Sequence, residues 1–406
     1  MDFPKHLDLQ KQLERALALD GAGEIDAALQ CLDAIEPQIP DHGPTLKLVG
    51  QLYQRLGADA QSLRHLARAL ALDPDDADLH MSLGYHYMDN GDPAAALGYF
   101  QSHLELDPTS VDGQVYLGRS FDFLGRLGEA EAALAAALAM APDDLGILHQ
   151  LGRVLLRLDD FAAAKRTFEA AIGLQAVDVL AEIGLARCRA LDHAAPPGPR
   201  PEAAPATVIC VKHGDKYGPE YVNRLQAMVR RNAGSIGGFV CFTENGEGLD
   251  ADIQVQPLPG AGLAGWWNKV ALFRRDLAGA RGRVLYLDLD VVITGNLDPL
   301  LCHPGDFVIM DNDYVPGFNS SVMLFEAGAR PEIFENFSAR DMARLDGDQD
   351  WIALQAPDAE LWPHLWCVPY RLRAALRPPA ETRVVAFSGR PNPADYPAEW
   401  VRELWR

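Results

Sequence analysis

The chain has 406 residues, 48% of them hydrophobic, which predicts two or three globular domains that each bury a core. It carries 57 acidic and 36 basic residues, and a net charge of −21 argues against nucleic acid as a partner. The six cysteines form no Cys-x-x-Cys pair and no apolar run could span a bilayer, so we expect a cytoplasmic protein without a transmembrane segment, zinc ribbon or disulfide framework.

The first half of the sequence repeats with a period of 34 residues. Proline and glycine both recur at this spacing, at Pro40, Pro74, Pro108, Pro142, Gly50, Gly84, Gly118 and Gly152. One helix–turn–helix unit per 34 residues is typical of the tetratricopeptide repeat, and residues 9 to 178 resemble this family. We expect an all-α solenoid of about five units, the first degenerate, closed by a helix at Val179–Leu191.

Aromatic residues at repeat positions are expected in the core of this solenoid. Tyr53, Tyr87 and Phe121 each lie three residues after a repeat glycine, where stacked helices pack against one another. An array of this kind has no chemistry of its own. The resemblance implies a concave groove that binds a peptide, a protein partner or a second copy of the chain, and the last case would give a homodimer.

A segment rich in proline and alanine, HAAPPGPRPEAAPA, separates the two halves of the chain. Such a segment cannot continue a helix and favours extended polyproline geometry. All seven tryptophans follow it. We therefore predict a repeat domain at residues 1–192, a linker at 193–206 and a second domain at 207–406.

The second half alternates predicted strands with predicted helices. Strands are expected at Thr207–Val211 and Gly238–Thr243, and a helix at Glu220–Arg231 lies between them. This order predicts an α/β domain with a parallel sheet and crossover helices. Open sheets bind ligands beyond the carboxyl ends of their strands, where this sequence places Lys212, His213, Asp215, Tyr217, Thr243 and Glu244.

The stretch Arg283–Pro299, RVLYLDLDVVITGNLDP, predicts a buried strand that ends in two carboxylates. Asp288 and Asp290 are one residue apart, and alternate side chains of an extended strand point the same way. Both could therefore reach one hard cation such as Mn²⁺ or Mg²⁺. The alternative is that one aspartate caps a turn and the other is solvated.

Several later stretches also set polar residues beside short apolar runs. Gly265–Phe273 predicts the start of a helix that carries Lys269. The others are FNSSVMLF (318–325), GDQDWI (347–352) and a last strand, VVAFSGRPNP (384–393). Together and in this order, the motifs of residues 207 to 393 resemble the nucleotide-sugar glycosyltransferases of the glycogenin type, family eight in the usual classification.

The resemblance implies a GT-A fold, a UDP-sugar donor, divalent manganese or magnesium, and retention of anomeric configuration. The enzyme would be a hexosyl- or N-acetylhexosaminyltransferase whose protein or glycan acceptor is recruited by the repeats. Asp288 and Asp290 would bind the metal. Donor contacts would come from His213, Asp215, Tyr217, Lys269, Asp288, Asn319, Ser320 and Arg390, and catalytic roles would fall to Lys269, Asp348 and Gln349.

One position departs from the pattern of the family. The last strand of these transferases usually supplies a metal-binding histidine, and the aligned residue here is Ala386. The third metal ligand is therefore open, with water, His213, His303 and Asp311 as candidates. The same departure motivates a second hypothesis, in which the chain is an interaction scaffold with a catalytically impaired transferase-like domain.

Two further interpretations concern single residues. A phosphatase of the haloacid dehalogenase type would use Asp288 as nucleophile, but it expects Gly-Thr after the second aspartate, where this chain has Val291 and Val292. Trp266 and Trp267, next to Lys269, are the tryptophans favoured to stack on a sugar. The alternative for both is ordinary packing in a core or at a rim.

Overall fold

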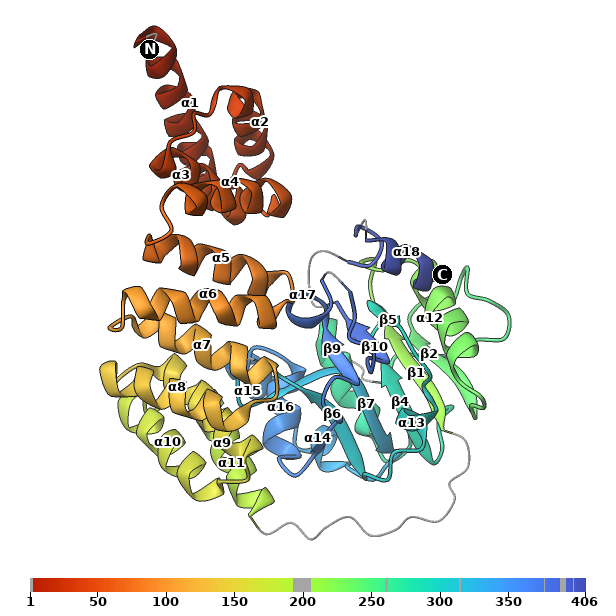
Figure 1. Ribbon diagram of the computed structural model, residues 1–406. Coiled ribbons are helices and arrows are strands. Elements are labelled where there is room, and N and C mark those ends of the chain that lie inside the picture. Colours follow the sequence, from red (N-terminus) through yellow and green to blue (C-terminus); the bar gives the residue numbers. More distant parts are fainter. Residues whose placement is uncertain are drawn as a thin grey trace. The chain divides into compact units, whose positions relative to one another are not determined.

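The computed structural model describes residues 3–192, 206–259, 262–313, 315–375, 377–387, 392–396 and 398–406. They form two compact units, Met1–Met140 and Ala141–Arg406. Figure 1 shows the helical first unit in red to yellow and the strands of the second unit in green to blue. The linker expected at 193–206 stays a prediction, because residues 193–205 lie outside the described residues.

The first unit is a series of helix pairs. Its elements are α1 Phe3–Gly21, α2 Ile25–Ile35, the 3-10 turn η1 Glu36–Gln38, α3 Gly43–Arg55, α4 Asp59–Leu72, α5 Ala77–Asp89, α6 Pro93–Leu106, α7 Val111–Phe123 and α8 Leu127–Met140. A Cβ atom at Gly50 would lie 2.7 Å from Leu66, and one at Gly84 would lie 2.4 Å from Phe100. Glycine therefore recurs because the two helices of each pair approach too closely for any side chain.

The second unit begins with three more helices, α9 Leu145–Arg157, α10 Phe161–Leu174 and α11 Val179–Leu191. We call these three helices the terminal repeat. They keep the same packing, since a Cβ atom at Gly152 or at Gly184 would lie 2.4 Å from the ring of Phe168. Asp144 and Asp178 cap α9 and α11 by accepting backbone N–H groups, as Asp76 and Ser110 do in the first unit.

The rest of the second unit is built on a mixed main sheet. Its order within the described residues is β3-β2-β1-β4-β7-β6-β8. The strands are β1 Thr207–Lys212, β2 Gly238–Thr243, β3 Gln254–Gln256, β4 Arg283–Leu287, β6 Phe307–Asp311, β7 Phe318–Glu326 and β8 Glu360–Leu361. Strands β1 to β4 are parallel, and β7 runs antiparallel to both β4 and β6. A small second sheet has the order β5 Val291–Ile293, β10 Val384–Ala386, β9 Cys367–Pro369.

Two apolar cores cover the two faces of the main sheet. Side chains alternate along the strands, so Val208 and Leu285 pack in the core that contains α12 Pro219–Asn232, while Ile209 and Val284 face the other. The second core is covered by η2 Gly265–Phe273, α14 Glu332–Glu335, α16 Asp348–Gln355 and part of the terminal repeat. The remaining helices are α13 Asp298–Leu301, α15 Ala339–Arg344, α17 Tyr370–Arg373 and α18 Glu399–Leu404.

One predicted helix takes a different form. Gly265–Phe273 is a 3-10 helix. The side-chain amide of Asn268 donates to the carbonyl of Gly265 at 2.9 Å, which is the carbonyl that the N–H of Lys269 would use in an α-helix. The tighter 3-10 turn still carries Lys269 toward the end of β4.

Candidate functional site

A pocket of about 460 Å³ lies where the order of the parallel strands reverses. From β1 the chain passes through α12 to β2 and β3 on one side of the sheet, and it returns to β4 on the other side. Such a switch point leaves a crevice beyond the carboxyl ends of the two central strands. The lining residues include Val211, His213, Lys216, Tyr217, Gly265, Trp266, Lys269, Tyr286, Asp288, Leu289, Asp290, Asn319, Ser320, Ser321, Asp346, Gly347, Asp348, Gln349 and Phe387.

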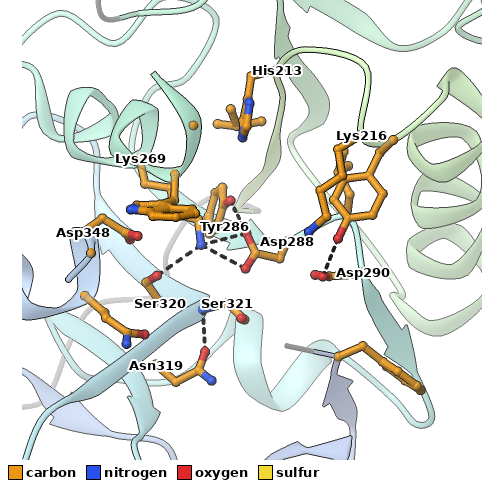
Figure 2. Close-up of a pocket in the computed structure, with 18 of the residues that line it drawn as sticks. His213, Lys216, Lys269, Tyr286, Asp288, Asp290, Asn319, Ser320, Ser321 and Asp348 are labelled. Atoms are coloured by element: carbon orange, nitrogen blue, oxygen red, sulfur yellow. Dashed lines mark hydrogen bonds and ion pairs between the residues drawn. The ribbon is translucent and has the colours of Figure 1, made fainter. Parts of the chain in front are cut away.

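An ion pair between Lys269 and Asp288 occupies the centre of this pocket (Figure 2). The Lys269 Nζ lies 2.9 Å from both carboxylate oxygens of Asp288 and donates to the Ser320 Oγ at 3.1 Å. The Tyr286 hydroxyl also donates to Asp288, because the two residues are two apart and share a face of the chain as β4 ends. This role of Tyr286 was missed by the sequence analysis, although that spacing could have revealed it.

Asp290 and Asp348 lie on opposite sides of Asp288 (Figure 2). Its carboxylate accepts a hydrogen bond from the Tyr217 hydroxyl at 2.7 Å, and its side chain is almost fully buried. Burial, followed by repulsion from the Asp288 carboxylate, raises the pKa of Asp290 to about 6. Asp288 to Asp290 is the segment that joins β4 to β5, so the expected single strand is divided between two sheets.

Asp348 enters the pocket as the first residue of α16. Its side chain is only 4% exposed, and burial raises its pKa. Ser320 hydrogen-bonds to this side chain, whereas Asp348 Oδ2 has no partner among the described residues. A buried acceptor without a donor costs free energy, so this oxygen is suited to a hydroxyl group of a bound ligand.

The carboxylates of the pocket outnumber its buried cations. Burial alone would lower the pKa of Lys269, but the carboxylates of Asp288 and Asp348 outweigh it and the pKa is raised. Asp290 adds a third carboxylate, and Asp288 and Asp290 are the residues that would hold a hard cation. Within the described residues no group of three or more His, Cys, Asp or Glu side chains could hold an ion. Further ligands would have to be oxygens of water or of a bound substrate.

The other residues predicted for the site differ in whether they line the pocket. His213, Asn319 and Gln349 line the pocket, and burial lowers the pKa of His213. Asp215 is exposed and is not among the lining residues. Arg390 lies outside the described residues.

The three side chains considered as a third metal ligand also differ in whether they line the pocket. His303 packs its ring against Trp362, with the ring centres 5.4 Å apart, and Asp311 pairs with Arg153 at 2.9 Å. Neither His303 nor Asp311 lines the pocket, whereas His213 does.

Ala386, the residue at the position where a metal-binding histidine would be expected, is buried at the end of β10. It pairs with Val291, the residue after Asp290, and the N–H of Phe387 donates to the Asp290 carbonyl at 3.1 Å. Phe387 itself lines the pocket and stacks on Tyr370, with the ring centres 4.3 Å apart. Phe387, the residue after β10, therefore contributes an aromatic wall to the pocket, and no residue of β10 itself is a metal ligand.

The two adjacent tryptophans face different surroundings. Trp267 is buried and packs against Phe337, with the ring centres 5.0 Å apart. Trp266 is 56% exposed and lines the pocket. Lys216, Ser321 and Asp346 line it as well and were missed by the sequence analysis; of these, Lys216 is adjacent to the predicted Tyr217.

Comparison with known proteins identifies the repeats. Tetratricopeptide repeat families match residues 50–111, 87–151 and 145–178. No curated protein matches the sequence. Within the described residues no helix has the length and apolar character needed to cross a membrane.

The chain is also similar to several solved structures, and each match covers less than half of the present chain. A MamA protein is 19% identical with a TM-score of 0.38, and the match covers 41% of this chain and 91% of that one. YrrB, "a TPR protein with an unusual peptide-binding site", is 21% identical with a TM-score of 0.38, over 45% and 96% of the two chains. The type IV pilus biogenesis factor PilW is 19% identical with a TM-score of 0.40, over 47% and 87%.

The N-terminal part is thus an all-helical tetratricopeptide repeat solenoid, an architecture that presents an extended surface for protein or peptide partners. The family matches lie between residues 50 and 178. They support a protein-interaction role for the repeats.

Proposed function

We propose that the second unit has a GT-A fold and transfers a sugar from a nucleoside diphosphate donor, a UDP-sugar, to an acceptor recruited by the repeats. One observation carries this proposal. Motifs far apart in the sequence, and in the order of the glycogenin-type transferases, supply Lys269, Asp288 and Ser320 to one bonded cluster. That cluster lies at the switch point of the sheet, where open α/β sheets bind nucleotides.

The charges of the pocket suit a nucleoside diphosphate bound together with a cation. The buried Lys269 ammonium would contact the diphosphate, and Asp288 and Asp290 would hold Mn²⁺ or Mg²⁺ beside it. The cation would supply electrostatic stabilisation of the departing diphosphate. Lys216 and Tyr217 line the Asp290 side of the pocket and would contact the nucleoside.

The transfer itself exchanges one bond for another at the anomeric carbon of the donor sugar. A hydroxyl oxygen of the acceptor bonds to this carbon, while the bond from the carbon to the diphosphate oxygen breaks. The electron pair of the broken bond stays on the nucleoside diphosphate, and the proton of the acceptor passes to a phosphate oxygen. Asp348 Oδ2, which has no donor among the residues that the structure describes, would accept a hydrogen bond from a hydroxyl of the transferred sugar and fix its orientation.

Titration calorimetry of UDP against the full chain, with and without Mn²⁺, tests the proposal. We expect the wild type to bind UDP more tightly with Mn²⁺, and Lys269→Met to weaken binding at least about tenfold because it removes the ammonium. Asp290→Asn should abolish the gain from Mn²⁺ and the metal-stimulated hydrolysis of a UDP-sugar. Asp276→Asn is the matched control, because Asp276 is exposed and not among the lining residues.

Two results would refute the transferase proposal. The first is a wild-type protein that does not bind UDP in the presence of Mn²⁺. The second is a Lys269→Met variant that binds UDP as well as the wild type does.

The second candidate function is an interaction scaffold whose α/β part is catalytically impaired. It is favoured by the repeat matches over residues 50–178, and by Ala386 at the position where the related transferases carry a metal ligand. A folded wild-type chain that binds neither UDP nor other nucleoside diphosphates would favour this reading over the transferase.

A further inference from the structure

Trp266 is an exposed aromatic residue at the mouth of the pocket. We propose that Trp266 forms the platform of an acceptor subsite that binds a carbohydrate, so that the acceptor hydroxyl belongs to a glycan and not to an amino-acid side chain. This inference rests on the proposed transfer reaction and specifies its second substrate.

The exposure of Trp266 sets it apart from the other tryptophans. It is 56% exposed and is the one aromatic among the exposed large hydrophobic residues of the described chain. Trp267, Trp351, Trp362 and Trp405 are all buried. An exposed indole in a concave site indicates a binding function, because covering its apolar surface is favourable.

The ring lies at the Asp348 end of the pocket. A Cβ atom on Gly347 would lie 3.6 Å from Nε1 of Trp266, so the edge of the indole rests against the backbone just before Asp348. Figure 2 shows Asp348 and Asp290 on opposite sides of the Lys269–Asp288 pair. Trp266 is therefore at the end where the transferred sugar would lie, away from Tyr217 and Asp290.

The lining residues differ in burial, and this difference indicates where the sugar donor and the sugar acceptor would each lie. The Lys269 side chain is 12% exposed and Asp348 is buried, so the diphosphate and the transferred sugar would occupy the deep part. Trp266 and Asp346 are exposed and Gln349 is half-buried, so they form the outer rim on the same side. The acceptor must approach the anomeric carbon from solvent, and on this side it passes the indole.

The chemistry of this rim suits a sugar ring. One face of a pyranose presents C–H groups with partial positive charge, which are attracted to the negative π face of an indole. The carboxylate of Asp346 and the amide of Gln349 are hydrogen-bond acceptors for sugar hydroxyls. The carboxylates beside the ring disfavour an acidic peptide, and they can accept hydrogen bonds from a neutral, hydroxyl-rich ligand.

The experiment compares Trp266→Ala and Trp266→Phe with the wild type in the full chain. The donor is the UDP-sugar that the wild type hydrolyses, and the probes are p-nitrophenyl glucoside, galactoside and N-acetylglucosaminide in both anomers, with a serine- and threonine-containing peptide for comparison. We expect transfer to a glycoside, and Trp266→Ala should reduce kcat/KM for transfer at least about tenfold more than it reduces donor hydrolysis. The loss should be mainly in KM for the glycoside, and Trp266→Phe should restore part of it, because it keeps an aromatic face.

Val255→Ala is the matched control, since Val255 is an exposed apolar residue of β3 that does not line the pocket. It should leave transfer and hydrolysis unchanged. Equal losses of transfer and hydrolysis in Trp266→Ala would overturn the inference. So would a wild type that hydrolyses its donor but transfers to the peptide only, or to none of the glycosides.

Tryptophan emission gives a second readout that does not need catalysis. Adding methyl glycosides should change the emission of the wild type and leave that of Trp266→Phe unchanged. If UDP does not bind but this change is seen, the proposed transfer fails while a carbohydrate site at Trp266 stands. If UDP binds and the glycosides leave the emission of the wild type unchanged, the acceptor subsite fails while the transfer proposal stands.

Discussion

An arginine recurs with the repeat period at Arg119, Arg153 and Arg187, and its surroundings differ between the two units. In the first unit, the Arg119 guanidinium lies 4.9 Å from the ring centre of Tyr116 in the same helix. In the terminal repeat, Arg153 pairs with Asp311 at 2.9 Å, and Arg187 lies 4.5 Å from the ring centre of Phe318. The arginine at this repeat position therefore contacts its own helix in the first unit and strands of the sheet in the second unit.

Both arginines of the terminal repeat contact one pair of strands. Asp311 ends β6, Phe318 begins β7, and the two residues pair in register. Burial lowers the pKa of Arg187 to about 10, although Asp311 and Asp358 act in the opposite direction. Strand β7 continues directly into Asn319 and Ser320 of the pocket. A constant sequence period therefore does not mark the limits of a structural unit, and the terminal repeat belongs with the sheet.

The largest expected loss of stability comes from Ile183→Ala in α11, which tests whether the terminal repeat unfolds with the sheet. Ile183 is fully buried in the core of the sheet, and truncation of a buried isoleucine costs about 2 to 5 kcal/mol. All seven tryptophans follow the repeats, so their emission reports unfolding of the α/β part, whereas far-ultraviolet circular dichroism reports the helices. We expect a lower denaturant midpoint in the emission curve.

Val115→Ala is the period-matched control for Ile183→Ala, because Val115 occupies the same repeat position in the first unit. It should shift the circular dichroism curve and leave the tryptophan curve unchanged. Equal shifts of the tryptophan curve in both variants would contradict the division after Met140.

Arg187→Leu should have an intermediate effect. It removes the guanidinium from the ring of Phe318 and its hydrogen bond, at 3.4 Å, to the Pro357 carbonyl, for about 1 to 3 kcal/mol in the tryptophan curve. Arg187→Lys should recover only part of the loss, because an ammonium lacks the planar stacking surface. Arg189→Leu, at an exposed position of the same helix, should match the wild type; an equal loss there would show that the buried contact is not responsible.

The smallest effect is expected from Lys47→Ala. Lys47 of α3 lies 2.8 Å from both Asp76 and Asp78 and joins neighbouring repeats of the first unit, at 21% exposure. A partly exposed pair of this kind contributes about 0.5 kcal/mol, and 0.5 M salt should remove most of that contribution. The loss should be visible by circular dichroism alone, so a shift in tryptophan emission would contradict the comparison.

The sequence predicted those features that depend on local spacing. The 34-residue period predicted the helix–turn–helix units, and the alternation of predicted strands and helices predicted a sheet with crossover helices, in which α12 joins the parallel strands β1 and β2. The prediction of carboxylates at the end of a buried strand named Asp288, and the resemblance to the glycogenin-type transferases added Lys269 and Asp348. All three residues line one pocket in the structure. The roles assigned to these residues stay predictions.

The features that escaped prediction depend on contacts between distant residues or on competition for one hydrogen bond. Arg153 and Asp311 are 158 residues apart, and no spacing rule connects them. The side-chain amide of Asn268 donates to the Gly265 carbonyl within the 3-10 helix, a contact that no sequence period predicts. The different burial of Trp266 and Trp267 could not be read from two adjacent identical residues.

The apolar face of α11 also has a consequence during synthesis of the chain. Helix α11 leaves the ribosome well before β7 and α16, whose residues share the core that buries Ile183. The earlier repeats can pack on their neighbours as they emerge, whereas this face stays uncovered until most of the sheet has been made. We therefore expect nascent chains that end between β4 and β7 to be the ones most in need of a chaperone.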